Sequence, residues 1–96
     1  MVSRNKEKLE KAKSEVLLYA PQSKVVVEAV DLSKLTKYSE YEESFRFTKK
    51  YDIGLLINNA GINFEGPFEK MSMKEVQDII SVNMLHPIYL TKVMLS

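Results

Sequence analysis

The chain has 96 residues and a formal net charge of +1, with 45% hydrophobic and 28% charged residues, which is ordinary for a globular protein. It contains no cysteine and one histidine, which excludes disulfides and thiolate metal sites and argues against a metal centre. Charges of both signs are interspersed and no apolar run approaches the roughly 20 residues of a membrane-spanning helix, so nothing favours nucleic acid, a membrane surface or a transmembrane segment.

The first part of the chain predicts a helix followed by a strand. Residues 1–5 are too few to form an element alone, although Ser3 or Asn5 can cap a helix. Apolar residues at steps of three and four predict that helix over Lys6–Tyr19, and Pro21 ends it. A run of β-branched residues then predicts a strand over Lys24–Val30.

The second part predicts a helix, a strand and a final helix. Residues 33–51 predict a turn and a helix with an aromatic side, made by Tyr38, Tyr41, Phe45 and Thr48. Ile53–Ile57 is a short apolar run without alternation, which is typical of a strand buried on both faces. Ser72 and Glu75 have capping-box spacing, and the helix that they open continues to the chain end. The order helix-strand-helix-strand-helix predicts an α/β fold with parallel strands.

The stretch from Asp52 to Gly61 organises this pattern. Its apolar half changes abruptly to Asn58, Asn59, Ala60 and Gly61. Asparagine tolerates unusual backbone angles, and alanine and glycine leave room for close approach to the main chain. Ligands of open α/β sheets bind outside the carboxyl ends of the strands. Spacing alone leaves two interpretations open, a ligand site and an ordinary exit from a strand.

Three motifs, which follow one another along the chain in the family's order, resemble the short-chain dehydrogenase/reductase family. Asn58–Gly61 resembles its NNAG motif, Val30–Leu32 resembles its third strand exit, and Ser81–Asn83 resembles the helix that carries its catalytic asparagine. The resemblance implies a Rossmann-like, doubly wound parallel sheet. Ser3–Asn5 and Asp52–Gly54 are further similar to membrane-associated ketoacyl and hydroxysteroid reductases of that family.

Two of the family's motifs are missing from this sequence. It has three glycines and no GxxxGxG turn for the pyrophosphate, and no Tyr-x-x-x-Lys. We therefore expect residues 1–96 to be an internal fragment of a single NAD(P)-binding Rossmann domain, in which the two predicted strands are not neighbours. We also expect the 96-residue chain alone to be inactive.

The resemblance implies a cofactor site made by three segments. Ser3 and Arg4 would bind the cofactor, with Arg4 against the adenosine 2′-phosphate of NADP. A guanidinium matches phosphate oxygens, whereas an NAD enzyme more often has an acid at that strand end. Asp31 would bond the adenine amino group and Leu32 would lie along the ring. Asn59, Ala60 and Gly61 would line the ribose and the route to nicotinamide. Arg4 is otherwise a surface charge, and Asp31 otherwise helps to start a helix.

Asn58 and Asn83 are assigned different roles. We expect Asn58 to tie neighbouring strands with its amide. Asn83 lies on the apolar side of its helix, where an amide is costly unless satisfied. Pro87 follows four residues later and removes the helical donor to the Asn83 carbonyl, so a kink is expected. The resemblance implies that this carbonyl holds a water of a proton relay; the alternative is an asparagine that only shapes the kink. We expect His86 to be a packing or surface residue.

Two functions remain open. In the first, the parent protein is an NADP-dependent oxidoreductase that transfers hydride between nicotinamide and a carbonyl or secondary alcohol, of ketoacyl or steroid type. In the second, the chain is a catalytically inactive truncated paralogue, at most an interaction module through its last helix. That helix could also join subunits of a homo-oligomer.

Overall fold

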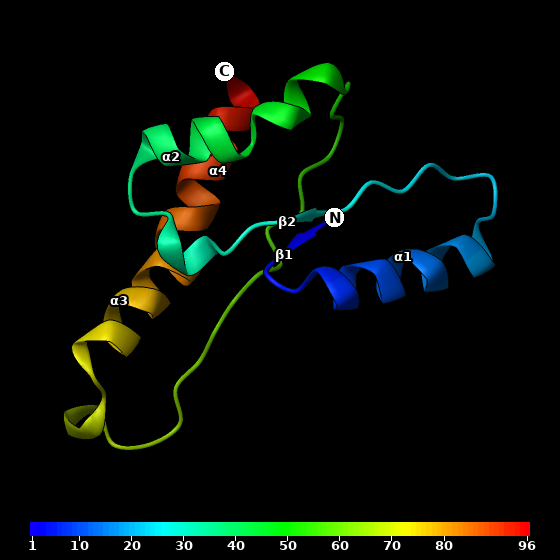
Figure 1. The fold of residues 1–96 in the computed structure, drawn as a ribbon. Coiled ribbons are helices and arrows are strands. Elements are labelled where there is room, and N and C mark those ends of the chain that lie inside the picture. The colour runs from blue at the N-terminus through cyan, green and yellow to red at the C-terminus, as the bar shows by residue number, and fades with distance from the viewer. The chain divides into compact units, whose positions relative to one another are not determined.

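The computed structural model describes residues 1–96, which divide into two compact units, Met1–Asp31 and Leu32–Ser96. Each unit is described by itself, with the elements labelled in Figure 1. None of the helices combines the length and apolar character that crossing a membrane requires.

The first unit is a strand-helix-strand motif. Strand β1 (Val2–Ser3) pairs in parallel with β2 (Glu28–Ala29), and α1 (Lys6–Tyr19) connects them. Parallel neighbours need such a crossover, because a tight turn cannot join their ends. The predicted helix is confirmed, and the Asn5 side chain caps it by accepting a bond from the Lys8 N–H.

The predicted strand Lys24–Val30 is too long. Only Glu28–Ala29 is a strand, since its partner β1 offers just two residues. The expectation that residues 1–5 form no element was also wrong, because Val2–Ser3 gains pairing from a segment far away in sequence. The chain therefore begins with a strand, not a helix.

The second unit consists mainly of helices. Helix α2 (Tyr38–Ser44) packs on α4 (His86–Leu95), and α3 (Met73–Ile80) leads into α4 through a widened turn, η4 (Ser81–Leu85). Three 3₁₀ turns, Leu32–Lys34, Arg46–Lys50 and Phe68–Lys70, complete the elements. The single helix expected within 33–51 is broken at Phe45, whose carbonyl accepts a bond from the Thr48 hydroxyl at 2.7 Å.

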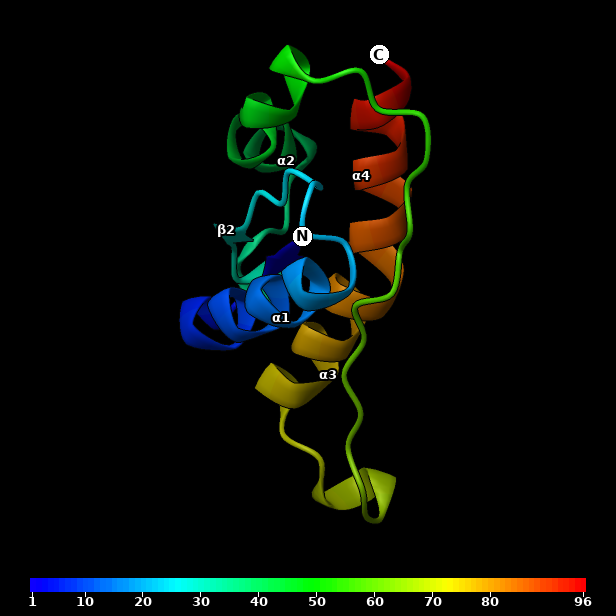
Figure 2. The same ribbon diagram turned by 90° about the vertical axis from the view of Figure 1, so that its right-hand side faces the viewer.

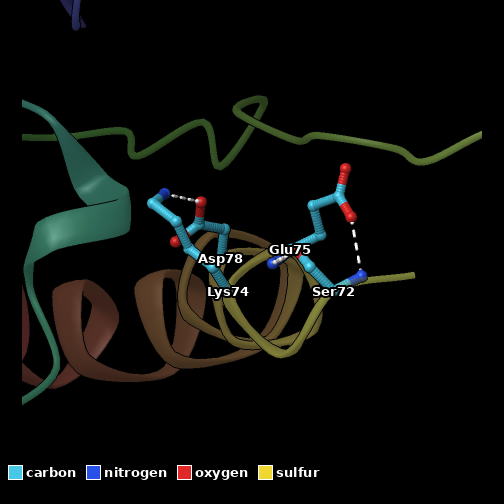
Figure 3. A network of polar contacts seen from close by, with 4 residues as sticks. All are labelled: Ser72, Lys74, Glu75 and Asp78. Atoms are coloured by element: carbon cyan, nitrogen blue, oxygen red, sulfur yellow. Dashed lines mark hydrogen bonds and ion pairs between the residues drawn. The ribbon is translucent and has the colours of Figure 1, made fainter. Parts of the chain in front are cut away.

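The start of α3 matches the sequence prediction. The Ser72 Oγ accepts from the Glu75 N–H at 3.2 Å, and the Glu75 carboxylate accepts from the Ser72 N–H at 2.8 Å (Figure 3). One turn along, the Lys74 ammonium pairs with Asp78 at 2.6 Å. The reciprocal cap satisfies donors that a helix start otherwise leaves to water.

The buried strand predicted over Ile53–Ile57 is absent. The segment has no strand partner, and Ile53, Leu55 and Ile57 are 46%, 77% and 75% exposed. A buried parallel strand needs neighbours on both edges and layers on both faces, none of which local sequence can supply. The Rossmann-like sheet is thus represented by β1 and β2 alone, and the expectation that the strands at 24–30 and 53–57 are not neighbours stays a prediction.

The core of the second unit lies between α2 and α4. Tyr41 and Phe45 are 0% and 1% exposed, and their rings are nearly parallel with centroids 6.0 Å apart. The Tyr41 hydroxyl is buried without a hydrogen-bond partner. Burial, followed by the charges of Tyr89 and Glu40, raises the pKa of Tyr41 to about 12.

We predict that Tyr41→Phe stabilises the protein by about 1 kcal/mol, because an unpartnered buried hydroxyl costs free energy. Thermal unfolding should show a midpoint about 4–8 °C higher for a chain of this size. Tyr38→Phe on the same helix is the matched control. Its hydroxyl already has a contact with the Ser96 Oγ at 3.4 Å, so no gain is expected.

Comparing the native chain with Tyr41→Phe also tests how stability changes at alkaline pH. A pKa raised from 10 to about 12 means that stability is complete below pH 10 and falls as the pH rises toward 12. Tyr41→Phe should lack this part of the loss. An unchanged or lower midpoint for Tyr41→Phe would show that its hydroxyl has a partner.

Candidate functional site

The widened turn η4 presents Asn83. The His86 N–H donates to the carbonyl of Ser81, five residues earlier instead of four. Pro87 follows immediately and has no N–H to give. Such π turns occur singly within α-helices, frequently at functional sites. The kink expected between Asn83 and Pro87 therefore takes the form of a widened turn.

The Asn83 amide is joined to one residue of the extended segment. Its Oδ1 accepts from the Ile62 N–H at 2.9 Å, and its Nδ2 donates to the Ile62 carbonyl at 2.8 Å. The side chain thus satisfies both backbone groups of Ile62, as a neighbouring strand would do. The prediction that Asn83 lies buried on an apolar face was wrong, since the residue is exposed. Its partners are main-chain atoms beside the helix.

A second bond lies farther along the same helix. The Asn58 Nδ2 donates to the Thr91 Oγ1 at 3.3 Å. Asn58 therefore ties the segment to a helix, not to a neighbouring strand as predicted. Asn58 and Ile62 are about 13 Å apart when extended, and Thr91 and Asn83 are separated by about 12 Å of helix. The two lengths match, and the earlier residue of the segment pairs with the later residue of the helix. The segment therefore runs antiparallel to η4 and α4 (Figure 2).

The three residues between these anchors are Asn59, Ala60 and Gly61, and all three are exposed. A Cβ added to Gly61 would lie 3.5 Å from the Asn83 Oδ1, which is an ordinary contact. Packing against Asn83 therefore does not require glycine here. The small residues leave the other side of the main chain accessible, as close approach of a ligand would need.

Ser3, Arg4 and Asp31 belong to the first unit. The Ser3 carbonyl accepts from the Val30 N–H at 2.9 Å, which sets the two parallel strands in register. Arg4 and Asp31 therefore follow the carboxyl ends of adjacent strands, at one edge of the small sheet. Arg4 is exposed and forms no ion pair, whereas Asp31 is half-buried.

Leu32 belongs to the second unit and is buried in its core, in a turn that packs on η4 and α3. No group of three His, Cys, Asp or Glu side chains is placed to hold a metal ion. Sequence reasoning missed Ile62, which participates only through its backbone, and Thr91, whose position two turns beyond Asn83 was the available signal.

We predict that Asn83→Ala exposes the Ile62 amide to exchange, because both bonds to that residue are lost. Asn83→Asp is the comparison variant: it keeps an oxygen acceptor for the Ile62 N–H, but it loses the donor and places a charged oxygen opposite the Ile62 carbonyl. Hydrogen exchange followed by NMR should show strong loss of Ile62 protection in Asn83→Ala and a smaller loss in Asn83→Asp. Equal protection in Asn83→Ala and the native chain would contradict the assigned bonds.

Comparison with known proteins assigns the chain to a family. The family model described as short chain dehydrogenase matches residues 1–96. The chain is 28% identical to 3-ketodihydrosphingosine reductase of Bos taurus over 93% of its own length and 27% of the relative's. It is 36% identical to very-long-chain 3-oxoacyl-CoA reductase of Neurospora crassa over 97% and 28%, and 31% identical to putative steroid dehydrogenase 4 of Caenorhabditis elegans over 95% and 36%.

The chain thus spans about a third or less of the length of these relatives. Its two-stranded parallel sheet with a crossover helix is part of the Rossmann-like α/β architecture of the matched family. Since the family model covers every residue of the chain, this protein belongs to the short chain dehydrogenase family.

Proposed function

We propose that this chain is part of an NADP-dependent oxidoreductase that transfers hydride between nicotinamide and a carbonyl or secondary alcohol. The observation that carries the proposal is the pair of bonds from Asn83 to Ile62. They join the family's asparagine to the residue directly after Asn58–Gly61. The two motifs that imply a nicotinamide site thus meet in one unit.

The chain is proposed to be an internal part of one NAD(P)-binding Rossmann domain. Three apolar side chains of the extended segment, Ile53, Leu55 and Ile57, are largely exposed. Burying them would favour association with further strands, since each large apolar side chain contributes about 1.5–3 kcal/mol when buried. The missing glycine-rich turn and Tyr-x-x-x-Lys support the same proposal.

The donor sets fit the proposed cofactor. Arg4 offers an unpaired guanidinium next to Ser3, and Asp31 offers a carboxylate at the neighbouring strand end, for the phosphate and the adenine respectively. Asn59, Ala60 and Gly61 leave the backbone open beside the ribose. Leu32, the proposed apolar wall for the adenine, is 7% exposed. When bound, the cofactor supplies or accepts the hydride.

Asn83 is proposed to be the catalytic contribution of this chain. Its side chain is engaged with Ile62, so only its backbone carbonyl is left for chemistry. Pro87 lowers the number of N–H donors that can reach carbonyls of this turn. A carbonyl without a helical donor can hold a water, and that water would extend a proton relay toward the reacting oxygen.

The relatives' names favour a substrate with a ketone at position 3. Two of them act, by name, on a 3-keto or 3-oxo compound. We propose a ketoacyl substrate for the longer enzyme. A steroid is the second choice, supported by the match to a putative steroid dehydrogenase.

The second candidate function is an interaction module without activity. Its support is the exposed apolar surface of η4 and α4, where Met84, Ile88 and Leu95 are 57%, 59% and 83% exposed. Such a surface could join two copies of the chain. The flanking coding sequence distinguishes the candidates, because a reductase requires GxxxGxG upstream and Tyr-x-x-x-Lys downstream, whereas a truncated paralogue lacks them.

We predict that Arg4→Asp in the longer enzyme reverses or abolishes a preference for NADPH over NADH. Charged hydrogen bonds contribute about 1.5–3 kcal/mol, or roughly ten- to a hundredfold in affinity. Kd values for both cofactors provide the measurement. Lys6→Asp, an equal charge change two residues later, is the control and should leave selectivity intact. Unchanged selectivity in Arg4→Asp would remove this residue from the site.

We also predict that Asn83→Ala lowers kcat of the longer enzyme far more than its affinity for cofactor. The carbonyl survives the substitution, but the bonds that fix its turn do not. Pro87→Ala should act in the same direction more weakly, because it restores an N–H. Turnover is measured per folded molecule, beside the melting midpoint. Normal turnover in folded Asn83→Ala would leave a structural role only.

A further inference from the structure

The imidazole of His86 is buried among aromatic side chains. His86 is 5% exposed, and its ring centroid lies 6.0 Å from that of Tyr41 and 6.5 Å from that of Phe45. Its Nδ1 has no hydrogen-bond partner, and neither has the Tyr41 hydroxyl. Packing, not hydrogen bonding by Nδ1, therefore accounts for the position of this ring.

His86 is also the residue that closes the turn bearing Asn83. Its N–H donates to Ser81, and both Ser81 and Val82 are buried with it. Asn83 comes next and is exposed, holding Ile62. The turn thus has an inner side, with Ser81, Val82 and His86 buried in the core, and an outer side that is hydrogen-bonded to the extended segment through Asn83. Loosening the inner side would displace the outer one.

The surroundings of His86 offer no compensating negative charge. On α2, Tyr41 is uncharged at neutral pH, and the Glu40 carboxylate accepts bonds from the N–H groups of Thr36 and Lys37. On α3, Asp78 is paired with Lys74. The other carboxylates on these helices are exposed: Glu43 pairs with Arg46, Glu75 accepts from the Ser72 N–H, and Glu42 lies at the surface. The remaining titratable groups on the packed elements are Tyr38, Tyr89, Lys34 and Lys92. A proton on the imidazole would therefore be a buried charge without a counter-ion.

We propose that His86 is a positioning residue for Asn83. Its uncharged ring, packed against Tyr41 and Phe45, holds the widened turn in the geometry in which Asn83 forms its two hydrogen bonds to Ile62. Protonation of the ring loosens the turn and breaks the hydrogen bonds between Asn83 and Ile62. The importance for turnover rests on the proposed function, but the release itself is a property of this chain alone.

The direction of the pH dependence follows from burial. Burial lowers the pKa of His86 below its ordinary 6.5. The unfolded or opened state therefore takes up the proton first. The hydrogen bonds between Asn83 and Ile62 are therefore fully formed above pH 6.5, and they are lost as the pH falls from 6.5 through the lowered pKa of His86.

NMR on the 96-residue chain tests the proposal without cofactor or substrate. His86 is the single histidine, so its imidazole signals give its pKa directly. Protection of the Ile62 amide, corrected for intrinsic exchange, should fall as the pH drops below 6.5, by about tenfold for each unit by which the pKa is lowered. The Glu75 amide, bonded to Ser72 at the start of α3, is the internal control and should not follow His86.

Two variants separate positioning from a general loss of stability. His86→Phe keeps an aromatic ring but cannot titrate, so Ile62 protection should become independent of pH between 5 and 7.5. His86→Gln, a smaller uncharged variant, should also remove the pH step and serves if His86→Phe does not fold. Asn83→Asp should keep the step, because it retains the acceptor for Ile62.

Three results would overturn the proposal: an imidazole pKa at or above 6.5, Ile62 protection that ignores the His86 titration, or a pH step that survives in both His86 variants. Equal changes at Ile62 and Glu75 would also overturn it, since they would show global unfolding. Failure of the proposed function is a separate outcome. It would appear as unchanged cofactor selectivity in Arg4→Asp of the longer enzyme, while the pH-dependent change in Ile62 amide protection is still seen in the 96-residue chain.

Discussion

Both backbone groups of Ile62 bond to one side-chain amide, and the place of the extended segment against the helix depends on that pair of bonds. An extended segment with no neighbouring strand has only water to satisfy its backbone, so its place against a helix must come from side chains. Asn83 supplies a donor and an acceptor at 2.8 and 2.9 Å, in the arrangement that a strand would offer. Asn58 adds a second tie to Thr91. Two asparagines thus do what a hydrogen-bonded ladder does elsewhere.

The widened turn explains why Asn83 can take this role. In a regular α-helix, residues three and seven positions apart share a face, so Asn83 would lie on the same side as buried His86 and Leu90. One longer hydrogen bond, from the His86 N–H to Ser81, shifts the phase of the helix at this point. Pro87 favours the shift because it removes a competing donor. The turn therefore separates a buried inner side, including His86, from an exposed outer side that carries Asn83.

Local signals predicted those parts of the fold that are determined locally. The capping residues Asn5 and Ser72 marked helix starts correctly, because a cap depends on groups within one turn. The motif around Asn58 and Asn83 indicated the family, which the match over residues 1–96 confirms. The strand at Ile53–Ile57 was wrong because strand formation requires a partner. The exposure of Asn83 was missed because helical periodicity assumes regular turns, and nothing in the sequence states where a turn widens.

The residues proposed for cofactor selection and those proposed for proton transfer lie in different units. Arg4 and Asp31 depend on the register of β1 with β2. Asn83 depends on η4, Pro87 and the aromatic packing around His86. The Asn83 side chain bonds to Ile62, within the second unit, and substitutions without shared partners usually act independently. The proposed cofactor selectivity is therefore expected to change independently of the proposed proton relay, and the proposed pH sensitivity of His86 is expected to affect turnover rather than cofactor choice.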